Sequence, residues 1–219
     1  QSQKPMKKLL LFLVTALALT LSACSQQACQ KTDNETQPAD TAMKQLPQDS
    51  AKILVLLAHP NMEKSKMNAA LAKAASEVEG VQVVNIYDYP VEADVYRQAV
   101  KNASVLVYQY PTQWLNCPSL LKQWTDDLLG TFIQEGLIEG KKFMVVTTTG
   151  SEEATYQHDG RNLFTMEEYL RPFEGMANHA KMVWQKPLTV YGHSTDPALA
   201  AKQLEEGVAE YQKRLEALK

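Results

Sequence analysis

Short apolar runs alternate with amphipathic stretches from residue 51 to the last residue printed. The runs carry few interspersed polar residues, which indicates strands buried on both faces, as in a parallel sheet joined by helical crossovers. The pattern predicts strands at residues 53–57, 81–86, 104–108, 143–147 and 181–190.

The stretches between the runs place apolar residues at helical spacing. Residues 66–78 are predicted as a helix that Gly80 ends, and residues 120–129 as a helix that Gly130 ends. Further helices are expected at residues 92–102, at 167–177 and from Pro197 onward. The last helix carries one apolar stripe: Leu204, Val208, Tyr211, Leu215 and Leu218.

This alternation of five strands and five helices predicts the fold class. Right-handed crossovers give an α/β domain with a doubly wound five-stranded parallel sheet, and we expect a single domain over residues 51–219. Ligands of such sheets bind beyond the carboxyl ends of the strands. The loops that follow the first, third and fourth strands are therefore the candidate site.

The first 23 residues predict a secretory signal peptide of the lipoprotein type. Two lysines precede an apolar run and small residues, and Leu21-Ser22-Ala23-Cys24 resembles the lipobox of bacterial lipoproteins. The resemblance implies cleavage before Cys24, lipidation of its sulfur and, with Ser25, the periplasmic face of the outer membrane in a Gram-negative cell. We expect a cell-envelope protein held on the membrane through its lipid anchor. An uncleaved anchor or a mis-assigned start is the alternative, and a cytoplasmic location follows only if the signal interpretation is wrong.

Residues 24–50 predict a flexible tether that starts at the lipidated Cys24. They are rich in Gln, Thr, Asp, Asn and Pro, and almost none is bulky and apolar. Beyond Cys24 the chain has only Cys29 and Cys117, which form neither a disulfide framework nor a zinc site, and a disulfide between the two stays open. We expect no metal. The net charge of −3 without a basic stripe argues against a nucleic-acid partner.

The loop after the first strand, residues 59–68, suits a phosphate. Ser65 stands where an N-cap would begin the first helix, and a helix N-terminus offers free N–H groups and the positive end of its dipole. A simple helix cap is the alternative. No G-x-G-x-x-G follows the first strand and no G-x-x-x-x-G-K-[ST] occurs in the chain, which disfavours a dinucleotide-binding Rossmann domain and a P-loop nucleotidase.

The other two loops suit a flat ring and its polar edge. Residues 108–118 combine aromatic and polar side chains between two prolines, although they could also form an aromatic loop that only packs on its neighbours. The threonine run 147–149 opens into Gly150 and Ser151, whose amides can face an anionic edge. Tyr156 and His158 are the candidate proton donors to a carbonyl substrate, or else solvated surface residues.

Together these loops resemble the flavodoxin-like NAD(P)H:quinone oxidoreductase family, which includes bacterial general stress proteins and the ancillary flavoprotein of a glutathione-gated potassium efflux system. The resemblance covers the whole domain. It is carried by His59-Pro60 with Ser65 and Asn68, by Gln109-Tyr110-Pro111-Thr112-Gln113-Trp114, by Thr147-Thr148-Thr149-Gly150, and by Leu170-Arg171-Pro172-Phe173.

The resemblance implies a flavodoxin-like fold and a function. Bound FMN or FAD takes a hydride from NAD(P)H, which leaves before a quinone or related acceptor is reduced by two electrons at the same place, a ping-pong scheme. It also implies a homodimer. A regulatory flavoprotein module that docks on a membrane transport partner is the first alternative. The second is a degenerate lipoprotein domain without flavin.

The resemblance also assigns residues. It implies that the flavin phosphate and ribityl chain are held by His59, Ser65, Lys66, Met67 and Asn68. It implies that the ring is contacted by Thr112, Gln113, Trp114 and Leu115 and by Thr148, Thr149, Gly150 and Ser151. Tyr156 corresponds to the family's substrate-side tyrosine, whereas His158 carries over by character only. Two departures weaken the match: Leu115 replaces a usual aromatic residue, and Thr149 replaces a usual second glycine.

Overall fold

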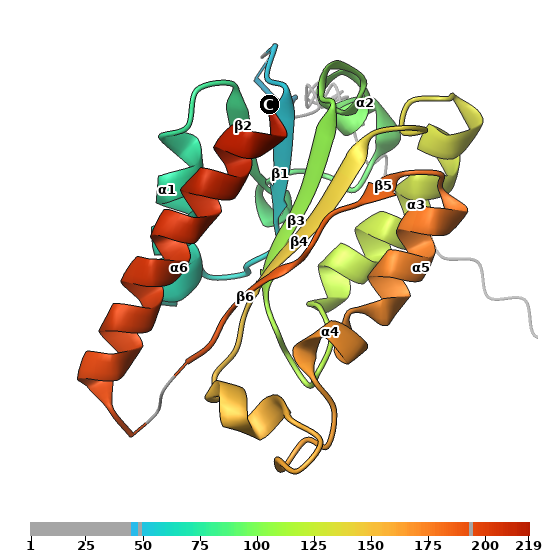
Figure 1. The fold of residues 1–219 in the computed structure, drawn as a ribbon. Helices are drawn as coiled ribbons and strands as arrows, with labels where there is room; N and C mark the ends of the chain where they lie inside the picture. The colour runs from blue at the N-terminus through green and yellow to red at the C-terminus, as the bar shows by residue number, and fades with distance from the viewer. Residues whose placement is uncertain (1–44, 48–49, 193–194) are drawn as a thin grey trace, which may run out of the picture. The chain divides into compact units, whose positions relative to one another are not determined.

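The computed structural model describes residues 45–47, 50–192 and 195–219, and its core is a parallel sheet (Figure 1). The strands are β1 (Ile53–Leu57), β2 (Val81–Asn85), β3 (Val105–Pro111), β4 (Lys142–Thr148), β5 (Val183–Trp184) and β6 (Leu188–Val190). Their order is β2-β1-β3-β4-β5, with β6 also paired to β4, and every pairing is parallel. The predicted doubly wound parallel sheet is confirmed.

Two layers of helices cover the sheet. In Figure 1, α1 (Met67–Ser76) and α6 (Pro197–Leu218) lie on one face, and α2 (Ala93–Asn102), α3 (Ser119–Gln134) and α5 (Arg171–His179) lie on the other. Successive side chains of a strand point to opposite faces. Ile53 and Val55 therefore pack with α1 and α6, whereas Leu54 and Leu56 pack with the other layer. Each fully buried aliphatic side chain stabilises the fold by about 1.5–3 kcal/mol.

The predicted fifth strand is interrupted. Only Lys142 and Phe143 of β4 pair with β5, and Val146 to Thr148 pair with β6. Residues 185–187 separate the two pieces, and Pro187 among them has no N–H to donate to a ladder. One predicted strand is thus two short strands on the same edge of β4.

Two predicted helices have other boundaries. The helix α3 continues through Gly130 to Gln134, because Phe132 is fully buried in the core, and Gly136 follows its end with a φ of 67°. The predicted helix 167–177 is two helices, α4 (Met166–Tyr169) and α5, and Thr165 and Glu168 form a capping box on the first. The described residues also contain three short 3₁₀ helices: η1 (Met62–Lys64), η2 (Ile86–Asp88) and η3 (Glu153–Tyr156).

The packed domain begins earlier than the sequence predicted. Leu46 is buried in the core cluster that contains Val95 and Ala99 of α2, and Gln82 donates a hydrogen bond of 3.0 Å to the carbonyl of Pro47. The last residues of the predicted tether therefore belong to the domain. The signal peptide, Cys24 and Cys29 lie outside the described residues. Within the part of the chain that is described, no helix has the length and apolarity needed to cross a membrane.

Candidate functional site

The three predicted loops lie at one edge of the sheet. Because β1, β3 and β4 are parallel neighbours, their carboxyl ends meet, and Pro111 is in register with Thr148. The register continues into the loops, where the Thr112 N–H donates to the Thr148 carbonyl at 2.8 Å. The hydroxyls of Thr112 and Thr147 are 2.8 Å apart. Figure 1 shows the segments after β3 and β4 below the sheet, on the same side.

A buried polar contact joins all three loops. Asn68, in the first turn of α1, is only 2% exposed, and its Nδ2 donates to Thr148 Oγ1 at 2.8 Å. Gln109 on β3 is fully buried, and its Nε2 donates to the Asn68 carbonyl at 3.0 Å. Buried polar groups cost free energy unless they are paired, so these bonds hold the start of α1 against β3 and β4.

The loop after β1 differs from its prediction at Ser65. Ser65 ends η1 in an extended conformation, and Lys66 is the N-cap of α1. Among the described residues, no side chain caps this helix. The predicted cap is thus absent, and the first N–H groups of α1 are not occupied by a capping side chain. Lys66 is exposed and Met67 half-buried beside them.

His59 is held at the end of β1 by the neighbouring strand. Asn85 of β2 donates from Nδ2 to the His59 carbonyl at 3.2 Å, and the Asn61 N–H donates to His59 Nδ1 at 3.2 Å. Partial burial lowers the pKa of His59 from its ordinary value. The bond from Asn61 requires Nδ1 to be unprotonated, which places the proton of the neutral ring on Nε2.

The loop after β3 turns at a strained tip. Gln113 and Asn116 bond to each other through both backbone groups, at 2.8 and 3.0 Å, and the two residues between them have positive φ, 48° at Trp114 and 64° at Leu115. Turns of this kind favour glycine and asparagine. The Trp114 side chain is 100% exposed. Strained backbone that presents a large apolar side chain to solvent is typical of a ligand-contacting loop.

The hydroxyl of Thr149 holds the loop after β4 together through two hydrogen bonds. It donates to the Ser151 carbonyl at 2.6 Å and accepts a bond of 3.4 Å from the Gly192 N–H. A Cβ at Gly192 would lie 2.5 Å from the Thr149 carbonyl, so only glycine allows this approach. Gly150 is exposed and Ser151 half-buried. Gly192 therefore lies directly against the backbone of this loop, and its N–H bonds to the Thr149 hydroxyl.

The two predicted catalytic residues have different surroundings. Tyr156 is buried against the rings of Tyr169 and Tyr191, with centroids 6.4 and 5.9 Å away. Burial raises its pKa above the ordinary value, and a hydrogen bond with Thr149 opposes that rise. His158 is exposed, and its Nε2 lies 2.9 Å from Glu168 Oε2, in the capping box of α4. The structure thus brings Tyr156 to the loop after β4 and His158 to α4.

Several residues of this edge were not assigned from the sequence. Gln109 was noted only as part of a motif, while Asn85, Gly192 and Arg161 were not singled out as site residues. A polar residue at the end of a predicted strand was the available signal for Asn85. Gly192 contacts Thr149 across 43 positions, and Arg161 contacts Ser151 across a loop of ten positions. Periodicity carries no signal for either contact.

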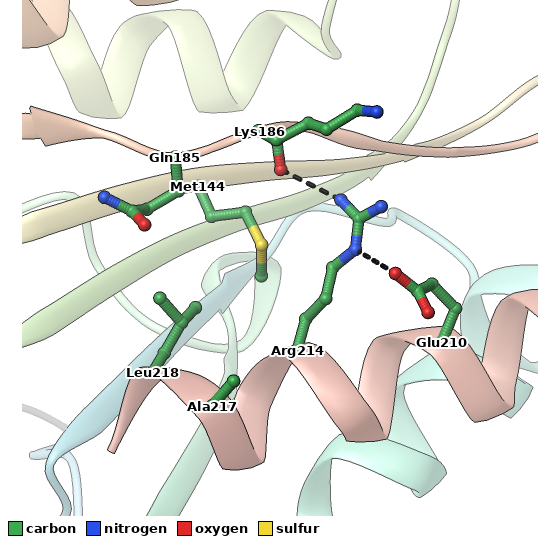
Figure 2. A pocket seen from close by; sticks show the side chains of 7 residues that line it. All are labelled: Met144, Gln185, Lys186, Glu210, Arg214, Ala217 and Leu218. Atoms are coloured by element: carbon green, nitrogen blue, oxygen red, sulfur yellow. Dashed lines mark hydrogen bonds and ion pairs between the residues drawn. The ribbon is translucent and has the colours of Figure 1, made fainter.

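One cavity of about 440 Å³ lies away from these loops, between the interrupted strand and α6 (Figure 2). Arg214 occupies its wall, donating to the carbonyls of Lys186 and Pro187 at 2.9 Å each and bonding to Glu210 at 2.8 Å. These bonds pair two carbonyls that the interruption of the strand frees. We interpret this arrangement as structural.

A doubly wound α/β sheet with a polar and aromatic carboxyl edge places the chain in the flavodoxin-like class, and comparisons with known proteins agree. The family described as "Flavodoxin-like fold" matches residues 51–215. The glutathione-regulated potassium-efflux system ancillary protein KefG of Enterobacter sp. (strain 638) is 35% identical over 150 residues, which cover 65% of this chain and 82% of that protein.

Two solved structures are also similar. General stress protein 14 of Treponema denticola, in complex with FMN, has a TM-score of 0.69 at 29% identity and covers 77% of this chain and 99% of its own. An NADPH-quinone reductase from P. pentosaceus has a TM-score of 0.64 at 26% identity and covers 75% and 97%. The chain belongs to the flavodoxin-like NAD(P)H:quinone oxidoreductase family.

Proposed function

We propose that the protein is a flavin-dependent oxidoreductase that transfers two electrons from NAD(P)H through FMN to a quinone-like acceptor in a ping-pong scheme. The observation that carries this proposal is the meeting of three features at one edge of the sheet. They are the uncapped start of α1, the exposed Trp114 and the loop 148–151. The FMN complex of the Treponema denticola relative favours FMN over FAD.

The residues present fit a flavin mononucleotide. A phosphate is stabilised at a helix N-terminus by free N–H groups and the helix dipole, and the ten-residue α1 offers both beside Ser65 and Lys66. Trp114 and Leu115 offer an apolar surface to a flat ring. The exposed Gly150 offers its amide to a polar ring edge without a side chain in the way.

When bound, FMN supplies hydride acceptance and donation. The chain's own contribution begins with Asn68 and Gln109, which hold the phosphate loop against the strands. The Tyr156 hydroxyl is protonated at neutral pH, and burial moves its pKa further upward, so it is suited to donate a hydrogen bond to a carbonyl oxygen of the acceptor. His158 stays a predicted proton donor, paired with Glu168 in the structure.

The first test is the visible absorption spectrum of the full chain before and after anaerobic NADPH, with a benzoquinone added last. Flavin bands that bleach with NADPH and return with the quinone support the proposal. A protein that binds neither FMN nor FAD contradicts it and leaves the degenerate form. In Tyr156→Phe we expect FMN to be retained and quinone reduction to slow, whereas in His158→Gln a smaller loss is expected because the ring is exposed.

A second candidate function is a regulatory module on a membrane transport protein. The curated relatives that carry this idea are the KefG proteins of Enterobacter and Pectobacterium, named as ancillary proteins of a potassium-efflux system and 34–36% identical to this chain. The two candidate functions can be distinguished by detergent extraction and pull-down of the full chain. A stoichiometric transport protein with slow quinone turnover favours regulation, and rapid turnover of many quinones without a partner favours the enzyme.

We also propose that the mature protein is held on the envelope membrane through a lipidated Cys24, a proposal that rests on the sequence alone. Mass spectrometry of the membrane-extracted protein should show a modified N-terminal Cys24, and Cys24→Ser should leave the precursor uncleaved. An unmodified Cys24 in a cytosolic fraction contradicts the anchor and leaves the flavin proposal intact. Since free NAD(P)H is scarce outside the cytosol, an envelope location would call for another electron donor. The predicted homodimer stays a prediction.

A further inference from the structure

Arg161 is the exception among the arginines of the chain. Arg97, Arg171 and Arg214 each form an ion pair with a carboxylate. Within the described ranges, the guanidinium of Arg161 has no such pair, and its contact is a hydrogen bond of 3.4 Å from Nη2 to Ser151 Oγ. A cation with spare donors therefore lies beside the loop 148–151.

The backbone on both sides of Arg161 is anchored. A Cβ at Gly160 would lie 2.2 Å from the Ala154 carbonyl and 2.8 Å from that of Thr155, so the chain passes too closely for any other residue. The Asn162 N–H donates to the Thr155 carbonyl at 3.0 Å, and the Tyr169 hydroxyl donates to the Asn162 carbonyl at 2.7 Å. Arg161 thus projects from a well-held position, which lowers the entropy cost of binding through its side chain.

The side chain of Arg161 lines a cavity of about 230 Å³ together with Ser151, Thr155, Thr195 and Glu152. Guanidinium donors and hydroxyls are the groups that proteins use for oxyanions, and arginine can bind a planar carboxylate through two bonds. The two parallel donors of a guanidinium match the paired oxygens of a carboxylate or a sulfonate, so these are the anions that the cavity is expected to take.

The cavity adjoins the residues assigned to the substrate. Ser151 lies in the loop predicted to contact the flavin ring, and the positive charge of Arg161 acts on Tyr156, opposing the burial that raises the Tyr156 pKa. Thr155, which lines the cavity, directly precedes Tyr156 in the chain, so a group held by Arg161 lies beside the segment that carries the proposed hydrogen-bond donor.

We propose that Arg161, with the hydroxyls of Ser151 and Thr155, forms an oxyanion subsite that binds an anionic substituent of the acceptor, a carboxylate or a sulfonate. The anion site itself is independent of the proposed function. Only the identification of its ligand as an electron acceptor rests on that function. It makes Arg161 the residue that selects acidic quinones over neutral ones.

The test is equilibrium binding of two matched quinones to the oxidised full chain. Anthraquinone sulfonate and its neutral hydroxymethyl analogue are compared in the unmodified protein, in Arg161→Gln and in Arg161→Lys. Because the change removes a charge-assisted hydrogen bond, we expect Arg161→Gln to weaken binding of the sulfonate at least roughly tenfold at low salt and to leave binding of the neutral analogue unchanged. In Arg161→Lys the affinity for the sulfonate should lie between that of the unmodified protein and that of Arg161→Gln. Added salt should reduce the preference of the unmodified protein for the sulfonate.

The control is Lys202→Gln, which removes an exposed positive charge on α6 and should leave the preference unchanged. If Arg161→Gln weakens the binding of both quinones equally, or weakens neither, the proposal is overturned. If instead Arg161→Gln weakens equilibrium binding of NADPH while binding of NADH and of the sulfonate is unchanged, the subsite takes a nucleotide phosphate and the acceptor assignment is wrong. Because binding is measured without turnover, this result is independent of the spectral test of the proposed function.

Discussion

The hydrogen bond between Asn68 and Thr148 should be measurable as a coupling energy. The two residues are 80 positions apart in sequence, their side chains are 2.8 Å apart, and both are buried. The perturbation is a double-mutant cycle of Asn68→Ala and Thr148→Val. Each single change removes one partner and leaves the other buried without it.

The magnitude follows from the cost of an unpaired buried polar group, about 1–3 kcal/mol. In Asn68→Ala this cost falls on Thr148 Oγ1, and the better helix propensity of alanine returns about 0.5 kcal/mol. In Thr148→Val it falls on Asn68 Nδ2. We therefore expect each single change to lower the free energy of unfolding by about 1–3 kcal/mol. In the double variant neither group is left unpaired, so the loss should be smaller than the sum by about 1 kcal/mol or more.

The assay is urea unfolding of the full chain followed by tryptophan fluorescence, with midpoints compared at constant slope. The control pairs Asn68→Ala with Ser76→Ala, at the other end of the same helix, where the two effects should add. If the losses of Asn68→Ala and Thr148→Val also add within about 0.5 kcal/mol, the bond does not join the loops and our account of the site is refuted.

Three further predictions concern single residues. Trp114→Gly should raise the free energy of unfolding by up to about 1 kcal/mol, because glycine adopts the positive φ without strain. The affinity for FMN, measured by dialysis, should fall because the exposed ring is lost. Tighter FMN binding would exclude Trp114 from the site. Gly160→Ala should destabilise the protein by about 1–3 kcal/mol, because the added Cβ meets two carbonyls. As a control, Gly130→Ala in the open interior of α3 should stabilise the protein by about 0.5–1 kcal/mol. Equal urea midpoints of the two variants would disprove the close approach at Gly160. The free energy of unfolding should fall as the pH drops through about 6.5, because the lowered pKa of folded His59 means that the unfolded chain binds the proton first. This part of the decline should vanish in His59→Gln. An identical pH profile in the variant would show that His59 does not contribute.

Much of the architecture could be predicted because its signals are local. Continuous apolar runs mark buried strands and a stripe at helical spacing marks α6, whose Tyr211, Leu215 and Leu218 are buried as expected. Since parallel strands end at a common edge, the same pattern also placed the loops after β1, β3 and β4 together.

The errors fall where tertiary packing overrides a local signal. Gly130 does not end α3, because the burial of Phe132 outweighs the weak helix propensity of one glycine. Leu46 lies in a segment that is otherwise mostly polar, and it is buried because it packs on α2 in the core. At the turn after β3, Trp114 and Leu115 adopt positive φ, although neither residue type favours it.

The sequence by itself determined the order of strands and helices, the family and the loops that form the candidate site, because hydrophobic periodicity and motifs act over a few residues. Only the tertiary structure decided the partners of the side chains. It paired Asn68 with Thr148 and His158 with Glu168, and it placed Arg161 beside Ser151 with no ion pair among the described residues. The physical reason is that a buried hydrogen bond or an unpaired charge depends on groups that folding brings together from distant positions, and no local pattern encodes that distance.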